Sequence, residues 1–187
     1  GSQPKSADSE YQEEYEQLIE EAPNEIEEER RGTINVEYGE QSFSVSIMQR
    51  VMFNVDVTFE AESLNGSSYY GKVDNADSYR YYLMLSTNGV NQSGNLYPDT
   101  SYYIFDIYAA TGAENGVATL PIGEYIFGAE GVAGSIYNGY SKLIETSQSG
   151  RREALFTDAR LIVSQEAIKA YITLDKGEKH YVTYSGN

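Results

Sequence analysis

The chain has no cysteine and no tryptophan, and His180 is its only histidine. The absence of cysteine excludes disulfides, thiolate nucleophiles and cysteine-ligated zinc. It also means that the redox compartment cannot be inferred from cysteine usage. A Ser-His-Asp triad would have to use His180, and no Gly-x-Ser-x-Gly elbow is present to expose a nucleophilic serine. Because His180 alternates with Val182 and Tyr184 in a predicted terminal strand, a structural or exposed histidine is favoured. We therefore predict that the protein is not an enzyme.

Positive charge and long apolar runs are also scarce. The chain has 13 Lys and Arg against 29 Asp and Glu, a net charge of −16. Such a chain repels a phosphate backbone and offers no polybasic patch to anionic lipid, so we predict no nucleic-acid binding and no electrostatic membrane binding. No stretch approaches the roughly 20 apolar residues that cross a bilayer. We expect neutral or cationic partners, no cofactor and no metal.

The sequence is rich in tyrosine, with 18 of its 187 residues, mostly in short alternating segments between Gly, Asn and Ser turns. Alternation of apolar and polar residues is typical of half-buried strands. Phe43, Val45 and Ile47 alternate with serines, and a turn around Gly39 pairs them with residues 33–37. Further strands are predicted at about 55–62, 78–86, 102–110, 124–128, 142–147, 154–164, 168–174 and 179–185. The last two form the clearest hairpin, because Gly177 supplies the turn between them.

No segment with helical periodicity interrupts these strands, so parallel βαβ units are not expected. We predict a mainly β fold, a single antiparallel meander of about 8–10 strands that closes into a barrel or a sandwich. The sequence leaves the choice between barrel and sandwich open. The oligomeric state is open as well.

The N-terminal segment differs from the rest in composition. Residues 1–31 carry eleven acidic and three basic residues, which is half of the net charge. Ser9 and Gln12 form a candidate capping box, and Pro23 would end the helix. Its apolar face would be Tyr11, Tyr15, Leu18, Ile19 and Ala22. We predict a short acidic helical spacer over residues 1–32, before a β domain over residues 33–187. Whether this helix is a tether, docks a partner or docks on the β domain is left open.

Two groups of acidic residues are candidates for chemistry. Asp56, Glu60 and Glu62 share one strand face at separations that glycoside hydrolysis uses, although a solvated strand face is the favoured interpretation. Asp74-Asn75-Ala76-Asp77 offers oxygen ligands that suit calcium, but it lacks the glycine and the distal glutamate of an EF-hand loop. We interpret it as a turn, and leave calcium binding by Asp74 and Asp77 open.

Tyrosines carry the stronger functional hint. Strands 78–86 and 102–110 have partly apolar faces on both sides, so either both faces are covered or one lines a binding surface. The high β-propensity of tyrosine is the simpler explanation. We predict a non-catalytic binding module for a carbohydrate or a small hydrophobic ligand. Its candidate ligand-binding residues are Tyr82, Tyr108, Tyr137 and Tyr140. The alternative is a structural component that docks a protein partner through the acidic helix or an edge strand.

Four segments suggest a resemblance: Tyr69-Tyr70-Gly71, the strand from Tyr102 to Tyr108, Leu120-Pro121-Ile122-Gly123-Glu124-Tyr125, and the closing segment from Tyr181 to Gly186. Their order resembles secreted Bacteroidetes lipoproteins of unknown function, with a lipocalin-like or sandwich-like β domain behind an acidic spacer. The resemblance implies an exported protein, acylated at a cysteine just upstream of Ser2 and anchored in the outer membrane at the cell surface. Residues 3–31 would be the spacer, and Gly1 and Ser2 a cloning remnant. The resemblance includes no catalytic motif.

Overall fold

The computed structural model describes residues 25–113 and 119–186, and all regular structure in them is β-strand. The mainly β prediction is therefore confirmed. The chain divides into two compact units, of which the first reaches Val55 and the second begins at Asp56. The predicted helix from Ser9 to Ala22 lies outside the described residues.

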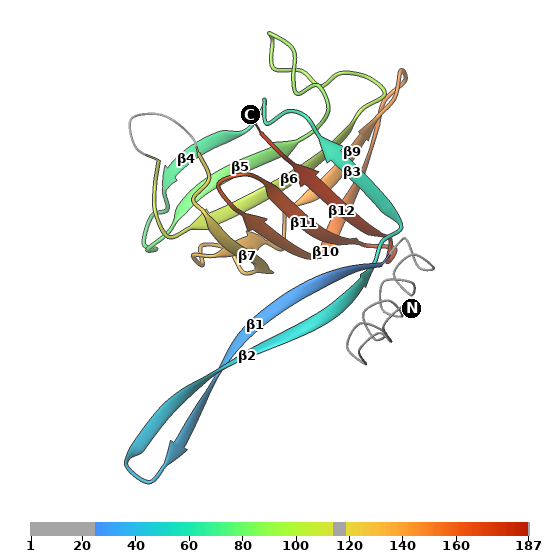
Figure 1. Ribbon diagram of the computed structural model, residues 1–187. Helices are drawn as coiled ribbons and strands as arrows, with labels where there is room; N and C mark the ends of the chain where they lie inside the picture. The colour runs from blue at the N-terminus through green and yellow to red at the C-terminus, as the bar shows by residue number, and fades with distance from the viewer. Residues whose placement is uncertain (1–24, 114–118, 187) are drawn as a thin grey trace, which may run out of the picture. The chain divides into compact units, whose positions relative to one another are not determined.

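The first unit is a long hairpin of β1 (Glu25–Tyr38) and β2 (Gln41–Asn54) (Figure 1). Its antiparallel register runs without interruption from Glu25↔Asn54 to Tyr38↔Gln41. Gly39, with φ of 62°, occupies the first central position of the turn, where a type II′ hairpin requires glycine. Residues 25–31, assigned to the acidic spacer from their charge, are thus part of a strand, because pairing with residues 48–54 overrides weak local propensity.

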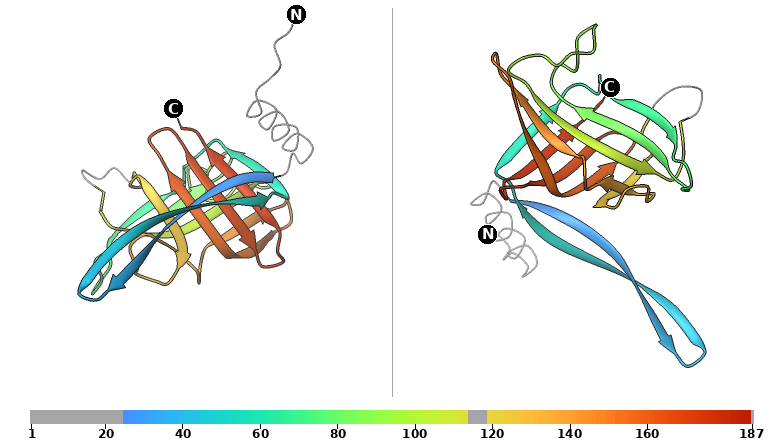
Figure 2. Two further views of the ribbon diagram at one scale, coloured as in Figure 1. Left: turned by 60° about the horizontal axis from the view of Figure 1, so that its bottom comes forward. Right: turned by 180° about the vertical axis from the view of Figure 1, so that it is seen from behind.

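The second unit is a ten-stranded sheet that curls around one interior (Figure 2). Its strands are β3 (Val57–Ala61), β4 (Ser68–Lys72), β5 (Tyr79–Leu85), β6 (Ser101–Ala109), β7 (Gly123–Gly128), β8 (Ser135–Tyr137), β9 (Lys142–Thr146), β10 (Arg151–Val163), β11 (Ile168–Leu174) and β12 (Lys179–Tyr184). Strands β6, β9, β10, β7 and β8 pair in a closed ring, a five-stranded barrel. Beyond this ring, β5 and β4 continue from β6, and β11, β12 and β3 continue from β10.

The prediction of a simple antiparallel meander is wrong, because β12 pairs with β3, and β7 with β8, in parallel. Asp56 holds the first of these pairs at its start. Its N–H donates to the Lys179 carbonyl at 2.9 Å, and its Oδ2 accepts from the Lys179 N–H at 2.9 Å. The predicted hairpin of residues 168–174 and 179–185 is confirmed as β11 and β12, with Ile168 opposite Tyr184. Strands β4 and β8 were not predicted.

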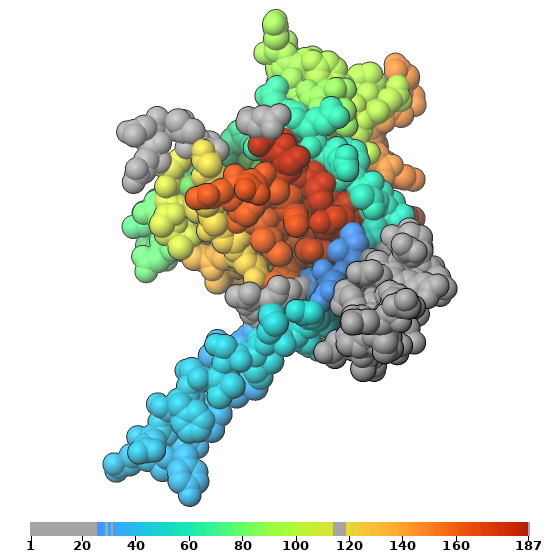
Figure 3. Space-filling model, viewed as in Figure 1, coloured from blue at the N-terminus to red at the C-terminus, as the bar shows by residue number. Residues whose placement is uncertain are grey.

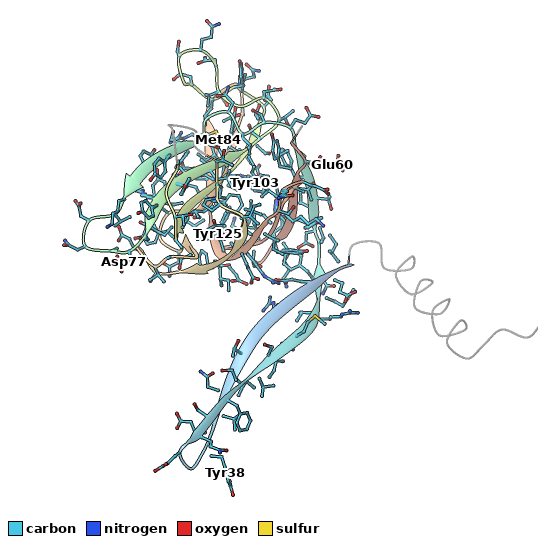
Figure 4. All side chains as sticks on the ribbon, turned by 60° about the vertical axis from the view of Figure 1, so that its left-hand side comes forward. Tyr38, Glu60, Asp77, Met84, Tyr103 and Tyr125 are labelled. Carbon is cyan, nitrogen blue, oxygen red and sulfur yellow. The ribbon has the colours of Figure 1, made fainter. Side chains whose placement is uncertain are left out.

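One core fills the interior of the second unit. Inward residues of β5 and β6 alternate along each strand, as in Tyr103, Phe105 and Ile107, and they meet residues of β10 and β11. The Phe105 and Phe156 rings pack edge to face, 5.3 Å apart. Tyr103 and Tyr125 lie in this interior (Figure 4). The opposite, outward face of β5 and β6 is where the tyrosine-rich surface lies.

Candidate functional site

A groove of about 600 Å³ lies on the outward face of β4, β5, β6 and β9. One wall is the segment 87–97, which stands out from the rest of the second unit in yellow-green at the top of Figure 3. Exposed or half-buried rings and cations lie around it: Tyr70, Tyr82, Tyr140, Lys142 and Arg151. The groove therefore combines aromatic rings with positive charge in a strongly acidic protein.

A second, small apolar cluster forms the floor. Met84, Ile104 and Ile144 are buried there beside Tyr102, and Val90 and Leu96 of the wall segment pack on them. The outward face of β5 and β6 is thus covered at one end and open at the groove. This arrangement explains why both faces of these strands carry apolar residues.

Hydrogen bonds hold the wall segment in place. The hydroxyl of buried Tyr102 donates to the Gly89 carbonyl at 2.8 Å and accepts from the Tyr97 N–H at 2.9 Å. The Asn91 side-chain oxygen accepts from the backbone N–H groups of Ser93 and Asn95, both at 2.9 Å. Because the segment is tied to the sheet at both ends, the groove is formed without a ligand.

Three tyrosine rings border the groove. Tyr70 and Tyr140 are 59% and 42% exposed, and the Tyr82 ring packs edge to face with Tyr70 at 6.3 Å. The guanidinium of Arg80 lies 5.2 Å from the Tyr70 ring centroid, and the ammonium of Lys142 lies 4.9 Å from that of Tyr140. These cation–π contacts fix the rings while leaving much of their surface accessible.

Burial raises the pKa of Tyr82 from 10 to about 12, with further contributions from Tyr140, Tyr70 and Asp106. The phenol is consequently protonated throughout the physiological pH range. Its hydroxyl can donate a hydrogen bond to a ligand in the groove.

Arg80 is positioned by a buried carboxylate. Its Nε donates to Oδ1 of Asp106 at 2.9 Å and its Nη2 donates to Oδ2 at 2.8 Å, a bidentate pair. This hydrogen bonding raises the pKa of Arg80 above its ordinary value. The Asp106 N–H donates to Ser141 Oγ at 3.1 Å, and that hydroxyl donates to the Tyr137 carbonyl at 3.0 Å. The network connects β5 and β6 to the segment that carries Tyr140.

The four tyrosines predicted from the sequence lie on this outward side, but only two border the groove. Tyr82 and Tyr140 line it. Tyr108 is buried and packs edge to face with Tyr137 at 6.3 Å, so its ring supports the surface rather than forming it. Burial also raises the pKa of Tyr108.

Sequence reasoning missed Tyr70 as a groove residue. The pairing of β4 with β5 shifts register between Tyr69 and Gly71, where Gly71 has φ of 93°. This bulge leaves Tyr69 against Tyr81 on the core side and Tyr70 on the groove side. The sequence feature that indicates this bulge is a glycine directly after two tyrosines in a strand-like segment.

Lys142 and Arg151, the two cations at the rim of the groove, share one carboxylate. Glu153 accepts from Lys142 Nζ at 3.2 Å and from Arg151 Nη2 at 3.1 Å. One negative charge therefore faces two positive charges at this side of the groove. A polar or anionic ligand would find donors there.

The acidic residues considered for glycoside hydrolysis do not form a pair inside a cleft. Asp56, Glu60 and Glu62 are exposed, and Asp56 is engaged at the start of β12. In the turn from Asp74 to Asp77, Asn75 adopts φ of 59°, which asparagine tolerates. In residues 25–113 and 119–186, no group of three or more His, Cys, Asp or Glu side chains is placed to hold a metal ion.

His180 is buried with both ring nitrogens in contact with partners. Tyr103 Oη lies 2.7 Å from Nδ1, and Glu178 Oε1 lies 2.5 Å from Nε2. Because the Glu178 carboxylate can only accept, we assign Nε2 as the donor to it, and this tautomer leaves Nδ1 to accept from the Tyr103 hydroxyl. This arrangement supports the structural role predicted for the histidine.

A second hollow of about 410 Å³ opens between β5, residues 119–122 and the β10–β11 turn. Apolar side chains dominate its lining, among them Leu64, Leu83, Leu120 and Ile168. It is the more suitable of the two sites for a small hydrophobic ligand.

Comparison of the chain with protein-family models, curated proteins and solved structures finds no match. The resemblance to secreted lipoproteins therefore stays a prediction. Among the described residues, no helix is long and apolar enough to span a bilayer.

Proposed function

We propose that this protein is a non-catalytic module that binds a carbohydrate in the groove between Tyr70, Tyr82 and Tyr140. The observation that carries the proposal is the convergence of these three rings around a preformed groove with a buried apolar floor. Sugar rings present C–H groups that pack on aromatic faces, and hydroxyls that need hydrogen-bonding partners. Apolar surface with a few placed polar groups is typical of ligand sites.

The groove also has polar groups that can form hydrogen bonds with sugar hydroxyls. Lys142 and Arg151 lie at the rim, and the protonated Tyr82 hydroxyl and Asn65 add neutral groups. Because two cations share Glu153, a carboxylated or sulfated glycan should bind more tightly than its neutral counterpart.

A small hydrophobic ligand in the 410 Å³ hollow is the second candidate. Its support is the apolar lining contributed by Leu64, Leu83, Leu120 and Ile168. Tyr82 borders both sites, whereas Tyr70 and Tyr140 border the groove alone. Loss of binding in Tyr140→Ala therefore separates the groove from the hollow.

Calorimetric titration with soluble glycans tests the groove. The panel contains neutral glucans, mannans and galactans, and acidic polygalacturonate, hyaluronan and chondroitin sulfate. We expect Tyr82→Ala and Tyr140→Ala to weaken binding at least tenfold, as stacked rings do when truncated. Tyr181→Ala is the matched control, because Tyr181 is a partly exposed tyrosine of β12 that lines neither the groove nor the hollow. Absence of binding by every glycan, or equal binding by all variants, would overturn the proposal.

We also propose, from the resemblance of the β segments, that the protein is exported and held at the cell surface by a lipid on a cysteine upstream of Ser2. The alternative function, a structural or protein-interaction component of a surface assembly, has the same location. Antibody labelling of intact cells that express the full-length gene tests it, and labelling only after lysis would contradict it.

A further inference from the structure

The hairpin of the first unit carries an apolar strip on one face. The register places alternate residues of both strands on the same side. The strip consists of Ile34, Val36 and Tyr38 from β1 and Phe43, Val45 and Ile47 from β2. Apart from the half-buried Val36, these side chains are 42% to 81% exposed. The opposite face is polar, with Thr33, Asn35, Glu37, Ser42, Ser44 and Ser46.

Among the described residues of its unit, residues 25–55, no second layer covers this strip (Figure 1). An isolated two-stranded hairpin is marginally stable in water, and a third strand or a packed layer is normally required. The exposed side chains of the strip amount to roughly 600 Å², at the upper limit of apolar patches on monomeric proteins. The strip therefore has the character of a docking surface.

Gly32 extends the same face, opposite Ile47. A Cβ atom at Gly32 would meet no atom within 4 Å, and its φ is not in the left-handed region, so neither space nor backbone geometry requires glycine. Because glycine has no side chain, the strip has a gap at this position, beside Ile47. The hollow of about 410 Å³ that Gly32 borders lies mostly against Thr33, Ser46 and Met48, whose side chains belong to the opposite face. Glycine inside a strand weakens it, and often marks the close approach of another molecule.

We propose that the strip docks a second copy of this chain, with two hairpins packed face to face and antiparallel about a two-fold axis near Asn35 and Ser44. The axis lies across the strands, so each β1 covers the partner's β1. Gly32 and Tyr38 are equally far from this axis, at opposite ends of the strip. Tyr38 of the partner subunit, the most exposed residue of its strip, lies over the gap that Gly32 leaves. Such reciprocal contacts are what a two-fold interface requires.

The remaining contacts of this arrangement are also complementary. Ile34 meets Val36 of the partner subunit, and Phe43 meets Val45 of the partner subunit. No charged side chain lies in the strip, whereas the whole chain carries −16. The negative charge on the remaining surface makes two copies repel each other. An uncharged face is therefore the one suited to close self-association.

The interface has a sufficient area for a dimer. Two strips bury roughly 1,200 Å² together, the lower limit of standard stable interfaces, and the flanking Gln41 and Gln49 add to it.

Sedimentation equilibrium of the full chain tests the dimer. We expect Gly32→Leu to weaken dimerisation at least tenfold, because leucine occupies the gap over which Tyr38 of the partner subunit lies, while the hairpin itself has room for it. Val45→Lys should do the same by placing a charge in the strip. Ser42→Lys is the matched control: it adds the same charge on the opposite face of β2, across from Glu37, and should leave the dimer intact.

Spin labels test the antiparallel arrangement. The chain has no cysteine, so Ser42→Cys and Arg50→Cys each give a single label per subunit. The axis near Ser44 places the two residues 42 about 13 Å apart along the strands, and the two residues 50 about 40 Å apart. Pulsed electron resonance should therefore give a much longer label distance for Arg50→Cys.

Three outcomes would overturn the proposal. One is a wild-type chain that is monomeric at all concentrations, including a monomer whose strip binds lipid vesicles or another protein instead. Another is a dimer that survives both Gly32→Leu and Val45→Lys. The third is equal label distances at positions 42 and 50, which would indicate parallel hairpins. Circular dichroism confirms that each variant is folded.

Discussion

At the residue scale, the buried Asp106 carboxylate is the group on which the groove geometry depends. It holds Arg80 through two hydrogen bonds and is itself fully buried, while Arg80 is 41% exposed. Removing one partner of a buried pair leaves the other without its counter-charge. Partial exposure of Arg80 reduces that penalty, because water can solvate the guanidinium.

We expect Asp106→Asn to lower the free energy of unfolding by about 1 to 3 kcal/mol. It should also weaken glycan binding, because Arg80 loses its fixed position beside Tyr70. Urea unfolding measures the first effect and calorimetry the second. Glu153→Gln is the control for stability, since exposed ion pairs contribute about 1 kcal/mol or less. Equal destabilisation by the two variants would contradict this role for Asp106.

The raised pKa values of Tyr125 and Tyr82 determine how the free energy of unfolding changes at alkaline pH. Burial raises the pKa of both from 10 to about 12. The unfolded chain ionises first, so the stabilisation is complete below pH 10 and is lost as the pH rises towards 12. For Tyr125 the loss is on the order of 2 kcal/mol.

Tyr125→Phe should therefore flatten the decline in stability between pH 10 and 12. At neutral pH it should cost about 1 kcal/mol, because the Tyr125 hydroxyl donates to the Pro121 carbonyl. Urea unfolding across this pH range measures both effects, with Tyr97→Phe, at an exposed tyrosine, as control. An unchanged pH dependence in Tyr125→Phe would show that another group causes the decline.

At the element scale, locally encoded features were predictable from the sequence. The turn at Gly39 and the hairpin around Gly177 combine alternating residues with a glycine at a position of positive φ. Strand β8 has only three residues in a glycine-rich segment, too short for alternation to show. Strand β4 is interrupted by the bulge at Tyr70, which breaks the period of two.

Non-local pairings explain what the sequence could not predict. Tyr82 and Tyr140 were predicted as ligand-binding residues, but their convergence depends on β6 lying between β5 and β9. The Arg80–Asp106 pair likewise depends on the register in which Tyr82 opposes Asp106. Neighbours and registers of this kind are determined by packing of the whole sheet, which single-strand patterns do not record.

At the scale of the whole molecule, two distinct surfaces belong to two distinct units. The groove lies in the unit that begins at Asp56, and the apolar strip lies in the hairpin that precedes it. A mutation in one unit should therefore leave the other surface unchanged. This separation allows the binding and dimerisation proposals to be tested independently, and then together.

If both proposals hold, each dimer presents two glycan grooves, and a polymeric ligand can engage both. The second binding event is then intramolecular, which raises apparent affinity without any new contact. We expect Gly32→Leu to weaken binding to an immobilised polysaccharide at least tenfold, and to leave binding of a short oligosaccharide unchanged. Surface plasmon resonance and calorimetry measure the two quantities, with Ser42→Lys as control. Equal affinity of Gly32→Leu and wild type for the polymer would mean that the two grooves act separately.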